Sequence, residues 1–206
     1  MPKQPPGGLH EYHVARPSVS GGFILSVGLG ATLTPSLGGP VQRINRLGNR
    51  TAISYTLRPL YSPTEGRIFV ARLMRGRQVG VIVVVPQSGI IVGTPGSPLV
   101  NGAVGGGIAL PIKGLTAGYV MKEGQPLSII HNSRRFLHWF AGDYTADGSG
   151  SGATNIYPPL RTALTNNDVI EIAKPYIEGS LSADSDRWSK QAAARNPISF
   201  TVTEDA

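Results

Sequence analysis

A repeat of apolar residues at every second position predicts a half-buried β-strand in residues 51–57. It places Ile53, Tyr55 and Leu57 on one face of that strand. Residues 79–85 form an almost continuous run of Val and Ile with a single Gly, which is typical of a strand buried on both faces. The pattern therefore predicts two strands of different burial in the first half of the chain.

The same alternation returns near the end of the chain. Ile198, Phe200 and Val202 face one way, and the hydroxyl residues between them face the other. A strand this regular needs a sheet to join, so we expect it to return to the first domain and to make that domain discontinuous. Residues 23–33 alternate small and apolar side chains and give a weaker strand prediction.

One helix is predicted between the first strands. Ser62, Pro63 and Glu65 match a capping box, with the proline at the position where its missing N–H costs least. An apolar stripe with arginines beside it follows. Gly76 stands where a glycine commonly ends a helix. We therefore expect a single helix packed on one side of a β-sandwich.

Gly and Pro are densest in residues 88–107, where we place a linker. Five short strands are predicted beyond it, at residues 108–112, 126–131, 135–140, 154–157 and 169–173. Closely spaced short strands favour a small barrel or sandwich. The predicted organisation is an N-terminal arm (1–20), a first β domain (21–87 with 196–206), a linker (88–107), a small β domain (108–180) and a connecting tail (181–195), with a helical pattern in 184–194.

The composition fits a mainly β protein and indicates shared surfaces. The chain has 27 Gly and 17 Pro among its 206 residues, interleaved with β-branched residues, as short strands and tight turns require. Charged residues make up 15% of the chain, against about 25% in ordinary soluble domains. So few charges predict that part of the surface is covered by other subunits.

The location of the protein is predicted from what the sequence lacks. There is no cysteine, which favours assembly in a reducing cytosol. Residues 1–8 contain Pro and Gly where a secretion signal would be apolar. The longest apolar run, residues 79–85, is far shorter than the roughly 20 residues of a membrane helix. We therefore expect no contact with a membrane.

The net charge of +7 is concentrated in the first part of the chain, since residues 1–87 contain ten Lys or Arg and two acidic residues. Such a region suits an anionic partner, either an acidic protein surface or a phosphate backbone. Aromatic residues are not interleaved with the arginines, so we favour a protein interface over nucleic acid. The candidate interface residues are Arg43, Arg46, Arg50, Arg72, Arg75, Arg77 and Trp188.

No cluster of reactive residues is predicted. His10 and His13 have a short metal-ligand spacing but no nearby third ligand. Asp143 and Asp147 lie in a Gly/Ser-rich loop that lacks the spacing of an EF-hand calcium site. Ser149 lies in the same loop, outside the strand-to-helix turn of a hydrolase nucleophile. We therefore predict neither an enzyme nor a cofactor or metal site.

The central stretch resembles minor tail proteins of long-tailed (siphophage-type) bacteriophages, of the distal-tail kind. The resemblance spans roughly residues 40–180. It rests on five segments: GTPGSPLVNG at 93–102, KEGQPL at 122–127, FLH at 136–138, TADGSG at 145–150 and IYPPLR at 156–161.

The resemblance implies a structural subunit of the virion tail, assembled in the cytoplasm of the bacterial host. Such subunits form a ring, usually hexameric, that joins the tail-tube protein to the tail-tip hub and the fibre proteins. Their first domain is similar to the tail-tube fold, a β-sandwich flanked by a helix, and their second module is an adaptor. Nucleic acid would be met only as the passing genome.

Three alternatives remain. The first is another virion connector, such as a tail terminator, a head-completion protein or a fibre adaptor. The second is a nucleic-acid-binding β-barrel that uses the arginine-rich part of the chain. The third is a small β hydrolase, which would depend on Asp143, Asp147 and His138.

Overall fold

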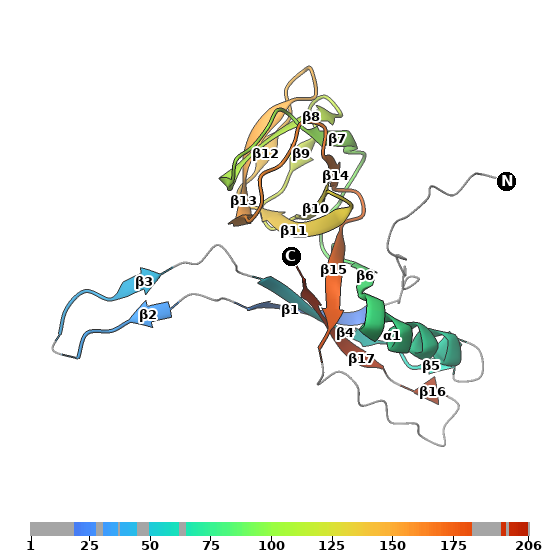
Figure 1. The fold of residues 1–206 in the computed structure, drawn as a ribbon. Coiled ribbons are helices and arrows are strands. Elements are labelled where there is room, and N and C mark those ends of the chain that lie inside the picture. The colour runs from blue at the N-terminus through green and yellow to red at the C-terminus, as the bar shows by residue number, and fades with distance from the viewer. Residues whose placement is uncertain are drawn as a thin grey trace.

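The computed structural model describes residues 19–27, 31–36, 38–44, 50–61, 65–182, 195–196 and 198–205. These residues form a five-stranded sheet, a closed six-stranded barrel and one helix, together with three short two-stranded pairs (Figure 1). The predicted mainly β fold with one flanking helix is therefore confirmed.

The five-stranded sheet is antiparallel and brings together segments far apart in the sequence. Its order is β1 (Val19–Val27), β4 (Arg50–Leu57), β17 (Ser199–Glu204), β15 (Tyr176–Leu181) and β6 (Val81–Val84). The last strand, β17, lies in the centre, where Phe200 is paired with Tyr55 of β4. This confirms that the C-terminal strand returns to the first domain.

The core of the sheet lies on the face covered by helix α1 (Arg67–Val79). Ile53, Tyr55 and Leu57 are buried there, as the alternation predicts. The rings of Tyr55 and Phe200 stack with their centroids 5.1 Å apart. Leu137 and Trp139 of the barrel strand β11 (Arg134–Phe140) pack into the same core, so the two β units share one apolar interface.

The helix begins and ends later than the capping pattern predicts. It starts at Arg67, and Gly66 at its N-cap forms no side-chain cap hydrogen bond; residues 62–64 lie outside the described residues. Glu65 instead pairs with Arg58 at 3.3 Å. The helix ends at Gly80, whose φ of 85° a residue with a side chain rarely adopts. Gly76 was therefore wrongly assigned as the cap, and it lies inside the helix.

The barrel closes in the order β10-β11-β13-β8-β7-β14. Apart from β11, its strands are β7 (Gly96–Val100), β8 (Gly107–Leu115), β10 (Pro126–His131), β13 (Gly152–Leu160) and β14 (Val169–Glu171). Strands β9 (Val120–Met121) and β12 (Tyr144–Thr145) form a separate pair beside it. Leu110, Ile112, Leu127, Ile129 and Ile156 are among the apolar side chains that fill its interior.

Two predicted boundaries need correction. Strand β7 lies inside residues 88–107, which we predicted as a linker, so the Gly and Pro residues there include turns of the barrel itself. Strand β15 begins inside the predicted second domain, residues 108–180, but belongs to the five-stranded sheet. The barrel strands thus occupy residues 96–171, inserted between β6 and β15 of the sheet.

Two further short strand pairs lie outside the main sheet and the barrel. Strands β2 (Ala31–Leu33) and β3 (Gln42–Ile44) form an antiparallel ribbon, and β5 (Leu60–Tyr61) pairs with β16 (Arg195–Asn196). Most of the predicted arm and of the connecting tail, including residues 184–194, lies outside the described residues. Among the residues that are described, no helix is long and apolar enough to span a membrane.

Candidate interaction surfaces and the joint between the two β units

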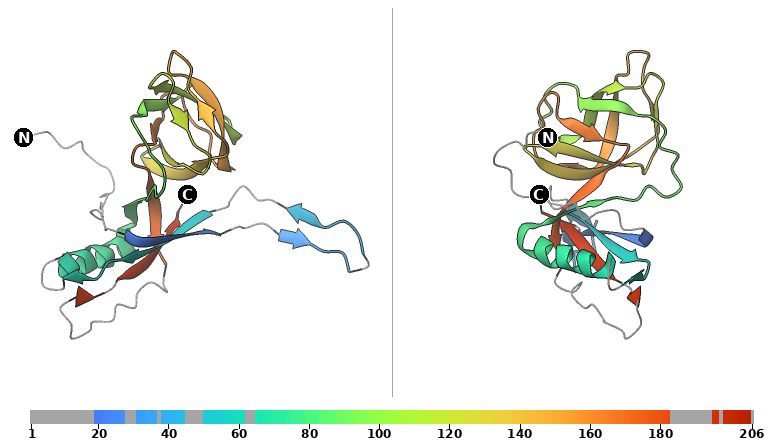
Figure 2. Two further views of the ribbon diagram at one scale, coloured as in Figure 1. Left: turned by 180° about the vertical axis from the view of Figure 1, so that it is seen from behind. Right: turned by 90° about the vertical axis from the view of Figure 1, so that its right-hand side faces the viewer.

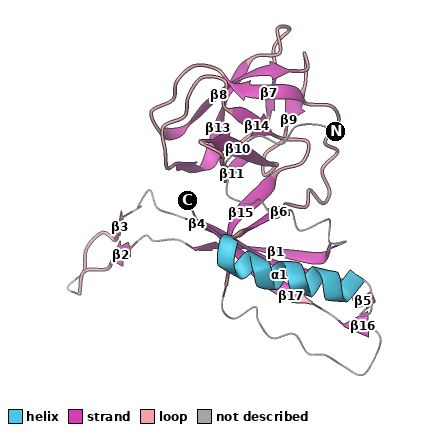
Figure 3. Ribbon diagram, turned by 45° about the vertical axis from the view of Figure 1, so that its right-hand side comes forward, coloured by secondary structure: helices cyan, strands magenta, loops and turns pink. Residues whose placement is uncertain are grey.

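Three of the predicted interface arginines lie on one helix. Arg72, Arg75 and Arg77 are exposed on α1, and the sequence of this helix contains no acidic residue. Met74 between them is 57% exposed. The other side of α1 packs against the sheet, as Figure 3 shows. The outward side of α1 is therefore positively charged and partly apolar, which suits an acidic protein surface with apolar patches.

The other predicted interface residues are not brought together with these three. Arg50 is exposed at the start of β4 and pairs with Val27 of β1. Arg43 lies on β3, paired with Thr32, and its side chain is not described. Arg46 and Trp188 lie outside the described residues.

The ribbon of β2 and β3 lies away from both the sheet and the barrel (Figure 2). Leu33 on β2 is 55% exposed, and Val41, just before β3, is 52% exposed. An isolated two-stranded ribbon is marginally stable in water, because two strands alone bury little apolar surface. This ribbon therefore has the properties of a segment that docks on another surface.

A buried carboxylate joins the sheet to the barrel. Glu204 on β17 is fully buried, and its Oε1 accepts a 2.9 Å hydrogen bond from the backbone N–H of Leu137 on β11. The same oxygen lies 2.5 Å from the guanidinium of Arg161, which follows β13. Its second oxygen, Oε2, accepts a 3.4 Å hydrogen bond from the N–H of Thr51 on β4. One side chain thus connects two strands of the sheet with two segments of the barrel.

The residue after Leu137 is a buried histidine. The Nδ1 of His138 lies 2.8 Å from the carbonyl oxygen of Pro158, so the Nδ1–H donates and Nε2 carries no proton in the neutral ring. The pKa of His138 is lowered to about 4, mainly because the ring is buried. The hydrogen bond with Pro158 acts in the opposite direction, and the nearby charge of Arg161 adds to the lowering. His138 therefore stays neutral beside Arg161 at ordinary pH.

A second polar cluster lies between β10, β11, β14 and β15. The guanidinium Nε of Arg135 lies 3.2 Å from Oε2 of Glu171, and the backbone N–H of Arg135 donates to Glu178 at 2.9 Å. Ser128 donates to the same oxygen of Glu171 at 2.6 Å and accepts from the N–H of Tyr176 at 3.1 Å. This second cluster also ties the barrel to the sheet, because Tyr176 and Glu178 belong to β15.

The acidic residues considered for chemistry hold turns. Asp143 accepts from Lys122 Nζ and from the N–H of Glu123, both at 2.8 Å, and the bond from Lys122 is the main reason why its pKa is lowered. Asp147 accepts from the N–H groups of Ser149 and Ser151, each at 2.8 Å. Within the part of the chain that the structure describes, no group of three or more His, Asp or Glu could hold a metal ion. His10 and His13 lie outside that part.

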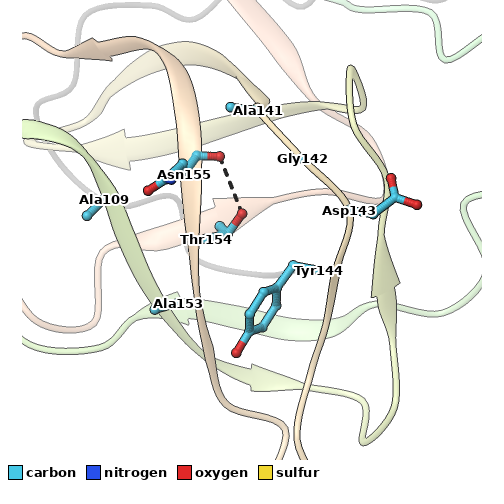
Figure 4. Close-up of a pocket in the computed structure, with 8 residues that line it drawn as sticks. All are labelled: Ala109, Ala141, Gly142, Asp143, Tyr144, Ala153, Thr154 and Asn155. Carbon is cyan, nitrogen blue, oxygen red and sulfur yellow. Dashed lines mark hydrogen bonds between the residues drawn. The ribbon is translucent and has the colours of Figure 1, made fainter.

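The outer surface of the barrel has a hollow of about 240 Å³ (Figure 4). It is lined by residues 141–144, residues 153–155 and Ala109. The carboxylate of Asp143 points away from the other lining residues in Figure 4, towards its partners Lys122 and Glu123. Apart from Asp143, the lining residues of the hollow are therefore uncharged.

The sequence matches no protein-family model and no curated protein. Sequence reasoning missed Glu204 and Arg161, although Glu204 continues the buried alternation of Ile198, Phe200 and Val202.

Proposed function

We propose that the chain is a structural subunit of a bacteriophage tail, of the distal-tail kind, which forms a closed ring and joins the tail tube to the tail tip and fibres. The observation that carries the proposal is the β2–β3 ribbon, which exposes Leu33 and Val41 away from the rest of the molecule. A ribbon that is weakly stable by itself gains stability when a neighbouring copy covers its apolar side chains.

The rest of the architecture supports the same role. A connector must transmit a fixed geometry between two sets of partners, and the buried Glu204 cluster and the Arg135 cluster both hold the barrel against the sheet. The sheet unit, with its ribbon and basic helix, would contact neighbouring copies and the tube. The barrel, at the other end of the joint, would contact the fibre or hub proteins. A ring repeats the same contact between every pair of neighbouring copies, so even a weak single contact holds the assembly together.

The test is the oligomeric state of the purified full chain. We expect closed rings in negative-stain electron micrographs and a matching mass by light scattering. The double substitution Leu33→Asp with Val41→Asp should leave monomers, because a charge at each position opposes burial of the ribbon. The control is Ile91→Asp in the segment between β6 and β7, since Ile91 is 98% exposed outside the ribbon and its substitution should leave the rings intact. A wild-type chain that stays monomeric at high concentration would overturn the proposal.

The arginines of α1 favour one function of a different class, which is binding of nucleic acid. This reading predicts that the purified chain binds duplex DNA with an affinity that falls steeply as salt rises. Arg72→Glu should then weaken binding, and Arg134→Glu, an exposed position on the barrel, serves as the control. A log–log salt slope near zero would exclude it.

A further inference from the structure

The hollow on the barrel exists because small side chains line up on β8, on β13 and just after β11. Asn155 on β13 is paired with Ala109 of β8 on one side, and its carbonyl accepts a 2.9 Å hydrogen bond from the N–H of Ala141 on the other. Residues side by side in a sheet point to the same face, and all three are exposed. Ala153, two residues before Asn155, faces outward as well. Three methyl groups around one amide leave room for a ligand to approach the strand.

The edge of β13 also opens towards this hollow. After Ala141 the segment that follows β11 no longer pairs with β13, because Tyr144 pairs with Met121 of β9. Backbone groups alternate in direction along a strand, so Ala153 turns its N–H and C=O to the same side as Asn155. Ala153 thus presents a donor and an acceptor next to the amide of Asn155.

An aromatic ring stands at one end of this surface. Tyr157 lies on the same outer face of β13, two residues beyond Asn155, and is 54% exposed. Two strand residues span about 7 Å, so the ring of Tyr157 is close enough to cover a group bound beside Asn155.

We propose that this surface binds a neutral saccharide, with one sugar ring in the hollow and the next against Tyr157. Sugar hydroxyls match the amide of Asn155 and the backbone groups of Ala153, which both donate and accept. The apolar C–H face of a sugar suits the face of an aromatic ring. A charged ligand finds no counter-ion here, because Asp143, the charged residue of the lining, is turned to Lys122.

The size of the hollow limits the ligand further. Its 240 Å³ is below the roughly 300 Å³ at which pockets for drug-sized molecules begin, so it admits a single ring. Such a small, open site binds weakly, with a dissociation constant on the order of 1 mM. The proposal does not depend on ring formation, because the barrel carries the whole site.

The test uses saturation-transfer difference NMR on the full chain with maltose, lactose, cellobiose and diacetylchitobiose, each at about 10 mM, which would largely fill a millimolar site. We expect signal for at least one of these disaccharides. Tyr157→Ala and Ala153→Leu should each reduce it at least fivefold, the first by removing the ring and the second by filling the hollow. Tyr61→Ala serves as the control, since Tyr61 is 48% exposed on β5 in the sheet unit.

Thermal melting of each variant shows whether it is folded, and both altered positions are exposed, so we expect little loss of stability. No signal from any of the four disaccharides would overturn the proposal. Signal that both Tyr157→Ala and Ala153→Leu retain would overturn it as well. Electron microscopy of the same samples scores ring formation separately, so failure of the saccharide site and failure of the proposed function are distinguishable.

Discussion

The carboxylate of Glu204, at the end of the last strand of the sheet, accepts a 2.9 Å hydrogen bond from the backbone N–H of Leu137 in the barrel. The pair is separated by 67 positions in the sequence. Burial of a carboxylate is unfavourable unless its charge is balanced and its oxygens accept hydrogen bonds. Arg161 supplies the charge and the N–H groups of Thr51 and Leu137 supply donors, so the two β units are joined by a compensated ion pair.

Removing the charge of Glu204 should therefore destabilise the protein strongly. In Glu204→Gln the shape of the side chain is kept, but the carboxylate charge that faces the buried guanidinium of Arg161 is lost, and we expect a loss of about 3 kcal/mol in the free energy of unfolding. The matched control is Glu65→Gln, which breaks the exposed ion pair with Arg58 and should cost less than about 1 kcal/mol. Urea denaturation monitored by tryptophan fluorescence measures both. Equal losses for the two variants would contradict this assignment.

A glycine inside α1 should resist replacement by alanine. Alanine normally stabilises a helix interior by about 1 kcal/mol relative to glycine. At Gly76, however, an added Cβ would come within 2.2 Å of Cγ1 of Val81 on β6, so Gly76→Ala should lower stability. The companion change Val81→Ala removes the obstructing methyl groups. We expect the loss of unfolding free energy in the double variant to be smaller than the sum of the losses in the two single variants. Losses that simply add would contradict a close contact between Gly76 and Val81.

The strands of the sheet could be predicted from the sequence wherever one face is buried. Residues 51–57 and 198–202 show a clean alternation because their apolar side chains face α1, while their polar side chains face the other way. The helix boundary could not be predicted in the same way. Ser62, Pro63 and Glu65 satisfy a local capping rule, but Glu65 pairs with Arg58 instead, and the packing of Gly76 on Val81 carries the helix one turn further.

The joint was harder to predict, because its members are distant in the sequence. Glu204 lies two residues after Val202, so its side chain points to the same buried face of the strand. A charged residue at a buried position indicates a buried ion pair. Its partner Arg161 follows a run that ends β13, and no periodicity links the two positions. The sequence predicts that the arginines of α1 lie beside an apolar stripe. The hollow around Asn155 could not be predicted, because it depends on which residues of neighbouring chain segments lie side by side.

The buried histidine beside the joint should make stability depend on pH. In the unfolded chain His138 binds a proton below its ordinary pKa of 6.5, whereas burial in the folded protein lowers its pKa to about 4. The unfolded state therefore binds more protons between these two values. The contribution of His138 to stability is complete above pH 6.5 and is lost as the pH falls to about 4, amounting to about 3 kcal/mol.

This contribution can be isolated with His138→Gln, which retains a donor for the carbonyl of Pro158 and has no charge to gain. Denaturation curves at a series of pH values between 7 and 4 should show a smaller decrease in unfolding free energy for the variant than for the wild type. Curves that run parallel over this range would show that His138 is not the group responsible.

The two β units should unfold together as long as the joint is intact. The strands of the barrel come from one continuous segment, residues 96–171, so the barrel has its own core and its own local pairings. Calorimetry of the wild-type chain should nevertheless show one transition, because Glu204 binds the barrel at Leu137 and the guanidinium of Arg135 lies 3.9 Å from Glu178 of the sheet. In the double variant Glu204→Gln with Arg135→Gln we expect two transitions, since each unit then unfolds at its own temperature. The double variant Arg58→Gln with Glu65→Gln, which removes an exposed ion pair, should keep a single transition. A single transition in both double variants would mean that the shared apolar packing of Leu137 and Trp139, and not the polar joint, couples the two units.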